Sequence, residues 1–471
     1  MSQPQPYPLE VTRALLDCAR DARFDFGEDT AIVAVQHMLL QTVDLIYAVI
    51  AMGVRPKNIF TLGKVYSNNL PVMRTLRDLG VTVVDTTVPE PGEFHRFFQQ
   101  DVNTLWQVAA ERLAERRIKR IIVLDDGGVC IISVPPEILR RYTVCGVEQT
   151  TRGMVLFEET PPPFAVIAWA RAGVKLEIAG PIFSQYLIEK VDTEFLHGSL
   201  QTDRVGIIGL GSIGRGVANL LRRQDKPIFF YDSKAELDVP ATVRNRITRL
   251  PSLEALMLHC DCVLGCSGRN PFKDQWPMDH RPGIKLLSGS SGDQEFGPII
   301  RDLKQKPHFD VAANTWDIVS PHGPSGPIHI AYLGYPYSFV SRATEAVPTR
   351  IVQVDSCGLL AALIQAKLFL EMCEIGVEQN RGIHRVSPKA QRFVYEKWSK
   401  TMKDRTIDIM ERYGYDPHLL SAVQHDDWFI QTTEPHPNEH YTPVKSVENL
   451  MEQFVASARL EVESEAHCGA L

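Results

Sequence analysis

Three glycines at fixed spacing, Gly209, Gly211 and Gly214, mark the segment of this chain whose chemistry is clearest. In such a spacing the first glycine permits a tight turn, the second lets a phosphate approach the backbone, and the third lets a helix pack closely on a strand. The helix that follows would also offer its unpaired N–H groups and positive dipole end to that phosphate, and Ser212 and Ile213 are expected to contact the cofactor as well. These residues predict a pyrophosphate site, and a glycine turn without a ligand is the simpler alternative.

The flanking segments complete a dinucleotide-binding pattern. Apolar residues 205–208 predict a strand before the glycines, and residues 217–221 predict a helix after them. Residues 228–231 predict a second strand, which ends at Asp232. A carboxylate at that position would accept hydrogen bonds from an adenosine ribose and repel a 2′-phosphate. The sequence therefore predicts NAD as the cofactor in preference to NADP, although the nearby Lys234 weakens that preference.

Polar side chains also follow an apolar segment further upstream. Asp125 and Asp126 come directly after residues 121–124, whose apolar run predicts a buried strand. Ligands of parallel sheets bind beyond the carboxyl ends of the strands, so we expect Asp126 to reach a substrate. For Asp125 we favour a structural role, in which the carboxylate caps the turn through backbone hydrogen bonds.

A second polar block is Glu148-Gln149-Thr150-Thr151. The hydroxyls of Thr150 and Thr151 suit contacts with a ribose or a nicotinamide, and ordinary turn chemistry is the alternative. Gln149 can hydrogen-bond a substrate hydroxyl, but its amide cannot act as a general base.

The segments that must position these residues alternate between strand and helix patterns, which predicts a parallel sheet. They are the strand patterns at 58–62, 81–84 and 121–124 and the helical patterns at 71–79 and 103–116. Residues 30–52 are apolar at helical spacing. We therefore expect His37 on a helix, where a hydrogen-bonded core histidine is as well supported as a ligand-binding one.

Strand patterns continue after the glycine unit, at 262–264, 284–287, 309–312 and 328–331, and helical patterns lie at 181–191, 352–371, 388–413 and 447–462. We predict an α/β fold in which a Rossmann NAD-binding domain is inserted into a second α/β domain, whose parallel sheet serves the substrate. A C-terminal helical extension follows. The predicted segments are 1–190 for the first part of the substrate domain, 191–347 for the NAD domain, 348–378 for a helical return and 379–471 for the extension.

Composition limits the partners of the chain. Its 471 residues, 44% of them hydrophobic, can bury a large core. A net charge of −7 offers no basic surface for nucleic acid. No apolar run reaches the about 18 residues that a membrane helix needs, and the polar N-terminus lacks a signal-peptide core, so we expect a cytoplasmic protein. Cys260, Cys262 and Cys266 lack the second ligand pair of a zinc site, and we expect buried thiols and no metal.

Several blocks, taken in order, resemble the S-adenosylhomocysteine hydrolase family. Residues 37–42 are similar to that family's His-Met-Thr-Val-x-Thr helix, residues 124–128 match its Leu-Asp-Asp-Gly-Gly, and residues 146–153 are close to its Gly-x-Ser-Glu-Glu-Thr-Thr-Thr-Gly. The resemblance covers roughly residues 30 to 370. It implies tightly bound NAD, oxidation of a substrate ribose hydroxyl, and a homo-oligomer of two or four subunits. The cofactor contacts that it implies outside the glycine unit are Thr150, Thr151, Ser267, Gly268 and Ser291.

The resemblance also implies an altered substrate site. Asp126 and His37 match the family's acid and histidine, but Gln149 stands where the family has a glutamate. No Asp-Asn pair follows Lys175 at the family's spacing, and Ser290-Ser291 replaces a Gly-His pair.

The leading hypothesis is an NAD-dependent enzyme that transfers hydride at a hydroxyl of a nucleoside-like or polyol small molecule. Asp126, Gln149 and Lys175 would hold the substrate, and Lys175 would accept the proton if burial lowers its pKa. Asp293 and Glu295 are a second possible source of acid–base chemistry beside the nicotinamide. A non-catalytic NAD-binding sensor or assembly subunit is one alternative, and authentic adenosylhomocysteine hydrolysis with relocated groups is another.

Overall fold

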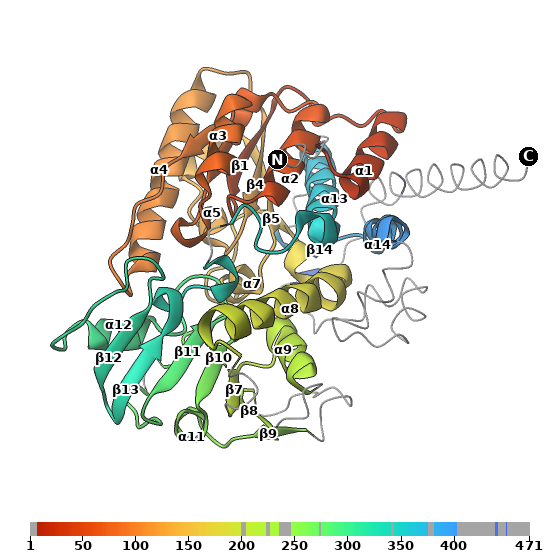
Figure 1. Ribbon diagram of the computed structural model, residues 1–471. Coiled ribbons are helices and arrows are strands. Elements are labelled where there is room, and N and C mark those ends of the chain that lie inside the picture. The colour runs from red at the N-terminus through yellow and green to blue at the C-terminus, as the bar shows by residue number, and fades with distance from the viewer. Residues whose placement is uncertain are drawn as a thin grey trace, which may run out of the picture.

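The computed structural model describes residues 7–198, 204–222, 227–234, 246–272, 275–340, 343–374 and 381–402, together with 439, 440 and 449. This part of the chain forms two β-sheets whose strands are almost all parallel, and helices flank each sheet (Figure 1). The fold class predicted from the sequence, α/β with a Rossmann domain and a helical part near the C-terminus, is confirmed.

The first sheet has the strand order β15-β14-β6-β5-β4-β1-β2-β3, and neighbouring strands are parallel throughout. The strands are β1 (Thr30–Val35), β2 (Ile59–Leu62), β3 (Thr82–Val84), β4 (Arg120–Asp125), β5 (Thr143–Glu148), β6 (Ala165–Ala168), β14 (Gly382–Arg385) and β15 (Glu439–His440). The strand order reverses between β1 and β4, so the crevice at a topological switch point lies beyond the carboxyl ends of these two strands.

Helices cover both faces of this sheet, which is why its central strands are apolar on both sides. Ala31 and Val33 of β1 pack into one core with Trp106 of α4, whereas Ile32 and Ala34 pack into the other core, with α1, α2 and α13. The helices of this part are α1 (Glu10–Asp21), α2 (Leu40–Ala51), α3 (Leu70–Asp78), α4 (Phe94–Ala114), α5 (Val129–Ile132), α6 (Pro136–Arg141), α7 (Thr151–Glu159), α13 (Thr349–Glu374) and α14 (Pro388–Met402).

The second sheet has the order β12-β13-β11-β10-β7-β8-β9, in which only β12 runs antiparallel to its neighbour. From β9 to β13 this is the doubly wound order of dinucleotide-binding domains, with β7 and β10 at the switch point. Its strands are β7 (Val205–Ile208), β8 (Ile228–Tyr231), β9 (Ile247–Arg249), β10 (Cys262–Gly265), β11 (Ile284–Ser288), β12 (Ile318–Gly323) and β13 (Gly326–Ile330), and its helices are α8 (Gly180–Lys190), α9 (Ser212–Arg222), α11 (Leu253–His259) and α12 (Gly297–Leu303).

Three sequence-based expectations need correction. The helix predicted over 30–52 begins only at Leu40, because residues 30–35 form β1; a strand buried on both faces has the same continuous apolar run as a buried helix. Residues 309–312 form no strand and contribute one isolated bridge, from Val311 to Ile318. Some strands were not predicted at all: β5, β6, β9, β12, β14 and β15. Of these, β14 adds residues 382–385 to the first sheet. The helix predicted at 447–462 lies outside the described residues.

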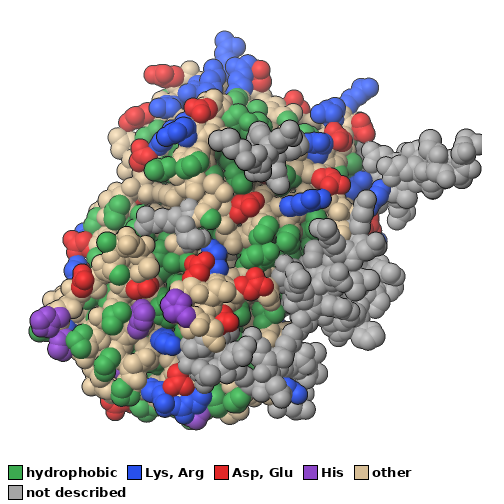
Figure 2. Space-filling model, in the orientation of Figure 1, with side chains coloured by type: hydrophobic (Ala, Val, Ile, Leu, Met, Phe, Trp, Pro, Cys, Tyr) green, Lys and Arg blue, Asp and Glu red, His purple; other side chains and the backbone are tan. Residues whose placement is uncertain are grey.

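One helix, Thr349–Met372, is long and apolar enough by length and composition to cross a membrane. The protein buries 89% of its most apolar window, as expected of a core helix. It is all of α13 except the last two residues, and α13 packs against the first sheet (Figure 1). On the face seen in Figure 2, acidic and basic side chains are interspersed, and histidines gather over the edge formed by β12 and β13.

Candidate functional site

The carboxyl ends of the two sheets meet at one place, which we call the junction. Tyr66 follows β2 of the first sheet, and its hydroxyl accepts a hydrogen bond of 3.3 Å from the backbone N–H of Gly292, which follows β11 of the second. The hydroxyl of Tyr332 donates to the Tyr66 carbonyl over 2.6 Å. Beside them, the N–H of Phe94 donates to Asp293 over 3.3 Å. Ligand-binding edges of both sheets therefore face each other.

The three glycines of the turn between β7 and α9 have different structural roles. Gly209 has a φ of +86°, and a Cβ there would lie 2.6 Å from the Cα of Ser267. A Cβ on Gly214 would lie 2.1 Å from the carbonyl oxygen of Gly209. At Gly211 a Cβ would meet nothing within 4 Å. Two glycines are thus required by packing, and the third leaves backbone open beside the N-terminus of α9, as a bound pyrophosphate requires.

Asp232 lies where the ribose-binding acid is expected, at the end of β8. Its Oδ2 accepts a hydrogen bond of 2.8 Å from the N–H of Leu210, and its Oδ1 accepts one of 2.9 Å from the N–H of Lys234. A carboxylate oxygen has two lone pairs, so both oxygens keep acceptor capacity for ribose hydroxyls. The residues of this region therefore fit NAD.

The other predicted cofactor residues follow later strands or the N-terminus of α7. Ser267 and Gly268 come after β10, and the Gly268 N–H donates to the hydroxyl of Ser290 over 3.0 Å. Ser291 is partly exposed next in the chain. Thr150 caps α7, because its hydroxyl accepts from the N–H of Gly153 over 3.0 Å. Thr151 is exposed at the first position of that helix. Contacts of these residues with NAD stay predictions, as do those of Ser212 and Ile213, which begin α9.

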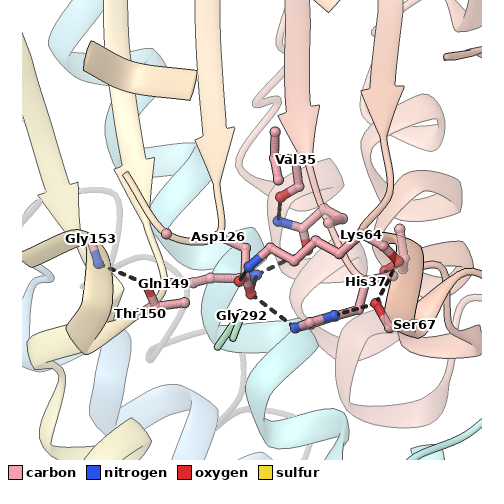
Figure 3. A network of polar contacts seen from close by, with 12 residues as sticks. Val35, His37, Lys64, Ser67, Asp126, Gln149, Thr150, Gly153 and Gly292 are labelled. Carbon is pink, nitrogen blue, oxygen red and sulfur yellow. Dashed lines mark hydrogen bonds and ion pairs between the residues drawn. The ribbon is translucent and has the colours of Figure 1, made fainter. Parts of the chain in front are cut away.

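Five side chains of the first sheet converge on one another at the junction (Figure 3). Lys64, which follows β2, forms a buried ion pair with Oδ1 of Asp126, which follows β4. Gln149 donates from Nε2 to Oδ2 of Asp126 over 2.5 Å. His37, in the loop after β1, has its Nε2 3.5 Å from the same oxygen and its Nδ1 2.6 Å from the hydroxyl of Ser67. We call these five residues the Asp126 cluster. It brings together three predicted residues, Asp126, Gln149 and His37.

Charge and burial fix the protonation of the Asp126 cluster. Burial raises the pKa of Asp126, but the Lys64 ammonium, His37 and the hydrogen bond from Gln149 together outweigh that effect and lower the pKa to about 2. Burial lowers the pKa of Lys64, but Asp126, Tyr66 and Asp125 together more than reverse that shift and raise the pKa. Burial also lowers the pKa of His37, and because Lys64 opposes the compensating effect of Asp126, that pKa falls to about 4. At neutral pH the cluster therefore holds one cation, one anion and a neutral imidazole.

Lys175 lies outside that cluster. It begins the π-helix η4 (Lys175–Ala179), and its Nζ pairs with Oδ1 of Asp355 over 2.6 Å. The indole N–H of Trp169 donates to the same oxygen over 2.7 Å. The charges of Lys175 and Asp355 both act on the pKa of His37, so this pair lies close to the Asp126 cluster. Sequence reasoning missed Asp355, Lys64 and Ser67.

Beneath Asp126, Asp125 and Glu148 form a buried pair of acids. They are register partners on β4 and β5, and each has one carboxyl oxygen without a hydrogen-bond partner, Oδ1 and Oε2. The other Asp125 oxygen accepts from the N–H of Ile131 over 2.9 Å, in line with the structural role predicted for it. Burial raises the pKa of Asp125 to about 7, and burial with the neighbouring Asp125 raises that of Glu148 well above its usual value.

Replacing Glu148 with glutamine should flatten the pH dependence of stability. A raised folded-state pKa means that stability is greatest at low pH and falls as pH rises above about 4.5, where the unfolded glutamate ionises. The glutamine side chain would be neutral at every pH. As pH rises, the free energy of unfolding of the variant should therefore increase relative to that of the wild type, by up to about 1.4 kcal/mol per pH unit. Urea unfolding between pH 5 and pH 9 measures the difference, and parallel curves for the two proteins would refute it.

The three cysteines considered as a possible zinc site lie close together in the sequence. Cys260, Cys262 and Cys266 are buried thiols that form no disulfide bond. Within the described ranges, no three His, Cys, Asp or Glu side chains are grouped so that they could hold a metal ion.

Comparison with known proteins identifies the cofactor domain. Residues 184–271 match the family model described as D-isomer specific 2-hydroxyacid dehydrogenase, NAD binding domain. The match runs from α8 through the glycine turn and Asp232 to Ser267 and Gly268. This part of the chain is an NAD-binding domain of the dehydrogenase type. NAD is its cofactor.

The expected membership of the S-adenosylhomocysteine hydrolase family is wrong, because the matched domain belongs to a different family. The three quoted blocks, 37–42, 124–128 and 146–153, lie at the carboxyl ends of β1, β4 and β5. Acids and glycines at such positions suit doubly wound sheets in general, since these are the edges where ligands bind. Authentic adenosylhomocysteine hydrolysis, which was expected only from that resemblance, is therefore not supported.

Two curated relatives carry no functional description. The uncharacterized proteins MT0113 and Rv0104 of Mycobacterium tuberculosis, strains CDC 1551 / Oshkosh and ATCC 25618 / H37Rv, are each 27% identical over 306 residues, 64% of this chain. The matched region spans 58% of the length of those relatives. An NAD-complexed D-isomer specific 2-hydroxyacid dehydrogenase from Lactobacillus delbrueckii ssp. bulgaricus aligns over 58% of this chain and 76% of its own, with 12% identity and a TM-score of 0.26, too low to bear on function.

Proposed function

We propose that this chain is an NAD-dependent oxidoreductase that acts on a hydroxyl of a small polyhydroxyl molecule bound at the junction. The observation that carries the proposal is the Asp126 cluster itself. It presents a carboxylate, an ammonium, an amide and a neutral imidazole at the edge of the first sheet that faces the cofactor domain. Bound NAD supplies the acceptor or donor of hydride.

Asp126 and Gln149 are suited to hold hydroxyl groups. The carboxylate accepts hydrogen bonds, and the Gln149 amide both donates and accepts. Lys64 keeps Asp126 ionised, and Lys175 is likewise paired, with Asp355. With both lysines neutralised by aspartates, the cluster favours neutral hydroxyl-bearing molecules, sugars, polyols and the ribose of nucleosides among them.

His37 is our choice for the proton acceptor. Its imidazole is neutral, and the Ser67 hydroxyl 2.6 Å from Nδ1 can pass a proton to it. Ser67 would take the substrate proton as it gives up its own, and Asp126 would stabilise the imidazolium from the Nε2 side. A hydrolytic triad has the opposite arrangement, with serine at Nε2 and the acid at Nδ1. Lys175, the acceptor predicted from sequence, instead pairs with Asp355 over 2.6 Å and is suited to donate hydrogen bonds.

The test begins with small molecules released from the purified protein and measured by mass spectrometry. NADH absorbance is then followed with polyols, sugars and ribonucleosides. For a reacting probe, Asp126→Asn should lower kcat/KM by ~100-fold, about 2.7 kcal/mol, while NADH affinity stays unchanged. Asp85→Asn is the control, since Asp85 pairs with Arg77 on the surface, with its side chain 81% exposed. Turnover unchanged in Asp126→Asn would refute the proposal.

The alternative is a non-catalytic NAD-binding sensor or assembly subunit. It predicts tightly bound NAD whose redox state no probe changes, which the same absorbance assay reports. Association into a dimer or tetramer also stays a prediction, and light scattering of the eluting protein would measure it.

A further inference from the structure

Glu295 is a buried carboxyl in the loop between β11 and α12, with only 1% of its surface exposed. Its Oε1 accepts two hydrogen bonds from Ser267, one of 2.6 Å from the backbone N–H and one of 2.7 Å from the hydroxyl. Its Oε2 accepts a third, of 3.0 Å, from the hydroxyl of Ser288. The side chain thus cross-links the ends of β10 and β11.

The end of β10 is shaped around this carboxyl. A Cβ on Gly265, the last residue of the strand, would lie 2.2 Å from Oε2 of Glu295. The glycine therefore leaves room for the acid. Any larger residue at 265 would push Glu295 away from Ser267.

Ser267 in turn forms the wall against which the glycine turn packs. A Cβ on Gly209 would lie 2.6 Å from the Cα of Ser267 and 2.8 Å from its backbone nitrogen. That nitrogen is the one whose hydrogen Glu295 accepts. A second link joins the same loops, because the N–H of Cys266 donates to the carbonyl of Ile208 over 2.8 Å. Moving Ser267 must therefore move the turn that faces the pyrophosphate.

We propose that Glu295 is a positioning residue for NAD, which fixes the Ser267–Gly268 loop opposite the glycine turn. Dinucleotides bind across the switch point of such sheets, with one half on each side. Asp232, at the end of β8, lies on the adenosine side of β7, whereas β10 lies on the other side. Glu295 therefore acts on the pyrophosphate–nicotinamide half of the cofactor.

This role differs from the acid–base chemistry that the sequence offered for Glu295. Both carboxyl oxygens are occupied by hydrogen bonds from Ser267 and Ser288. Glutamine can replace these contacts, because its oxygen can accept from Ser267 while its amide donates to Ser288. The Ser288 hydroxyl can then donate to the carbonyl of Ser290, 3.2 Å away. A positioning role thus survives in Glu295→Gln, and a proton-transfer role does not.

The experiment compares the affinities of Glu295→Ala and Glu295→Gln for NADH and for AMP, which carries only the adenosine half. In the alanine variant we expect the NADH Kd to rise about tenfold, ~1.4 kcal/mol, and the AMP Kd to change less than about twofold. The glutamine variant should bind NADH within about threefold of wild type. Asp261→Asn is the control and should leave both Kd values unchanged, because Asp261 lies at the opposite, amino end of β10, where it pairs with Arg204 over 3.2 Å.

Equal loss of NADH and AMP affinity in Glu295→Ala, or no loss of either, would overturn the proposal, as would a glutamine variant as weak as alanine. If the alanine variant does not fold, Ser267→Ala tests the same link, with an NADH Kd raised about threefold and AMP unaffected. The proposal rests on the NAD site and not on the proposed reaction. If no probe is turned over but these affinities are found, the proposed function is contradicted and the positioning role of Glu295 still holds.

Discussion

Gly211→Val should abolish measurable NADH binding while leaving the fold intact. A Cβ at residue 211 would meet no protein atom within 4 Å, so we expect the folded protein to accommodate the small valine side chain. The same open space is where the pyrophosphate must approach the N-terminus of α9. We expect the NADH Kd to rise at least ~100-fold, about 2.7 kcal/mol, with the melting temperature within a few degrees of wild type.

The matched comparison is Gly214→Val, three residues along the same turn. There a Cβ would lie 2.1 Å from the Gly209 carbonyl oxygen, so the turn itself must shift. This variant should lose thermal stability together with NADH affinity, whereas Gly211→Val loses affinity alone. Calorimetry with and without NADH measures both effects. Equal destabilisation by the two substitutions would mean that the space at Gly211 is not the cofactor's.

The glycine unit could be predicted because its elements are local in the chain. Strand, turn, helix and second strand lie within residues 205–232, and each required residue type follows from a constraint inside that segment. The position of Asp126 was also within reach, since residues at the carboxyl ends of parallel strands face the ligand side. Lys64 follows the end of β2, so the same rule would have predicted its place at the ligand edge of the sheet.

Other parts of the site have no local signal. Asp355 pairs with Lys175 across 180 positions of chain, and it lies within the apolar helix α13, where only the tertiary structure reveals its partner. Ser67 reaches His37 because a short helical turn, η2 (Val65–Ser67), follows β2. His37 itself was expected on a helix, and its true place after a strand is what brings it to Asp126. The resemblance to another family failed for a related reason, since strand-end acids and glycines report the architecture more than the reaction.

Lys64→Met should be the most destabilising single change at the Asp126 cluster. Both partners of the ion pair are buried, with side chains 3% and 5% exposed. Removing the ammonium leaves the Asp126 carboxylate buried without a counter-charge, which costs about 3–5 kcal/mol in comparable sites. The control is Arg77→Met at the exposed Arg77–Asp85 pair, where we expect a loss below about 1 kcal/mol.

The loss in Lys64→Met should depend on pH with a defined sign. Because Lys64, together with His37 and Gln149, lowers the pKa of Asp126 to about 2 against the effect of burial, the ion pair stabilises the wild type at every pH above about 4 and ceases to do so as pH falls through about 2. Without the lysine, burial raises the pKa of Asp126, so the carboxyl protonates in weak acid and the loss of stability relative to wild type becomes smaller.

The double variant Lys64→Met/Asp126→Asn removes the buried charge while keeping an acceptor for Gln149, and it should recover most of the stability at pH 7. Urea unfolding at pH 4 and pH 7 distinguishes these outcomes. A deficit that stays the same at both pH values, or a double variant no more stable than Lys64→Met, would mean that the lysine contributes packing and not charge.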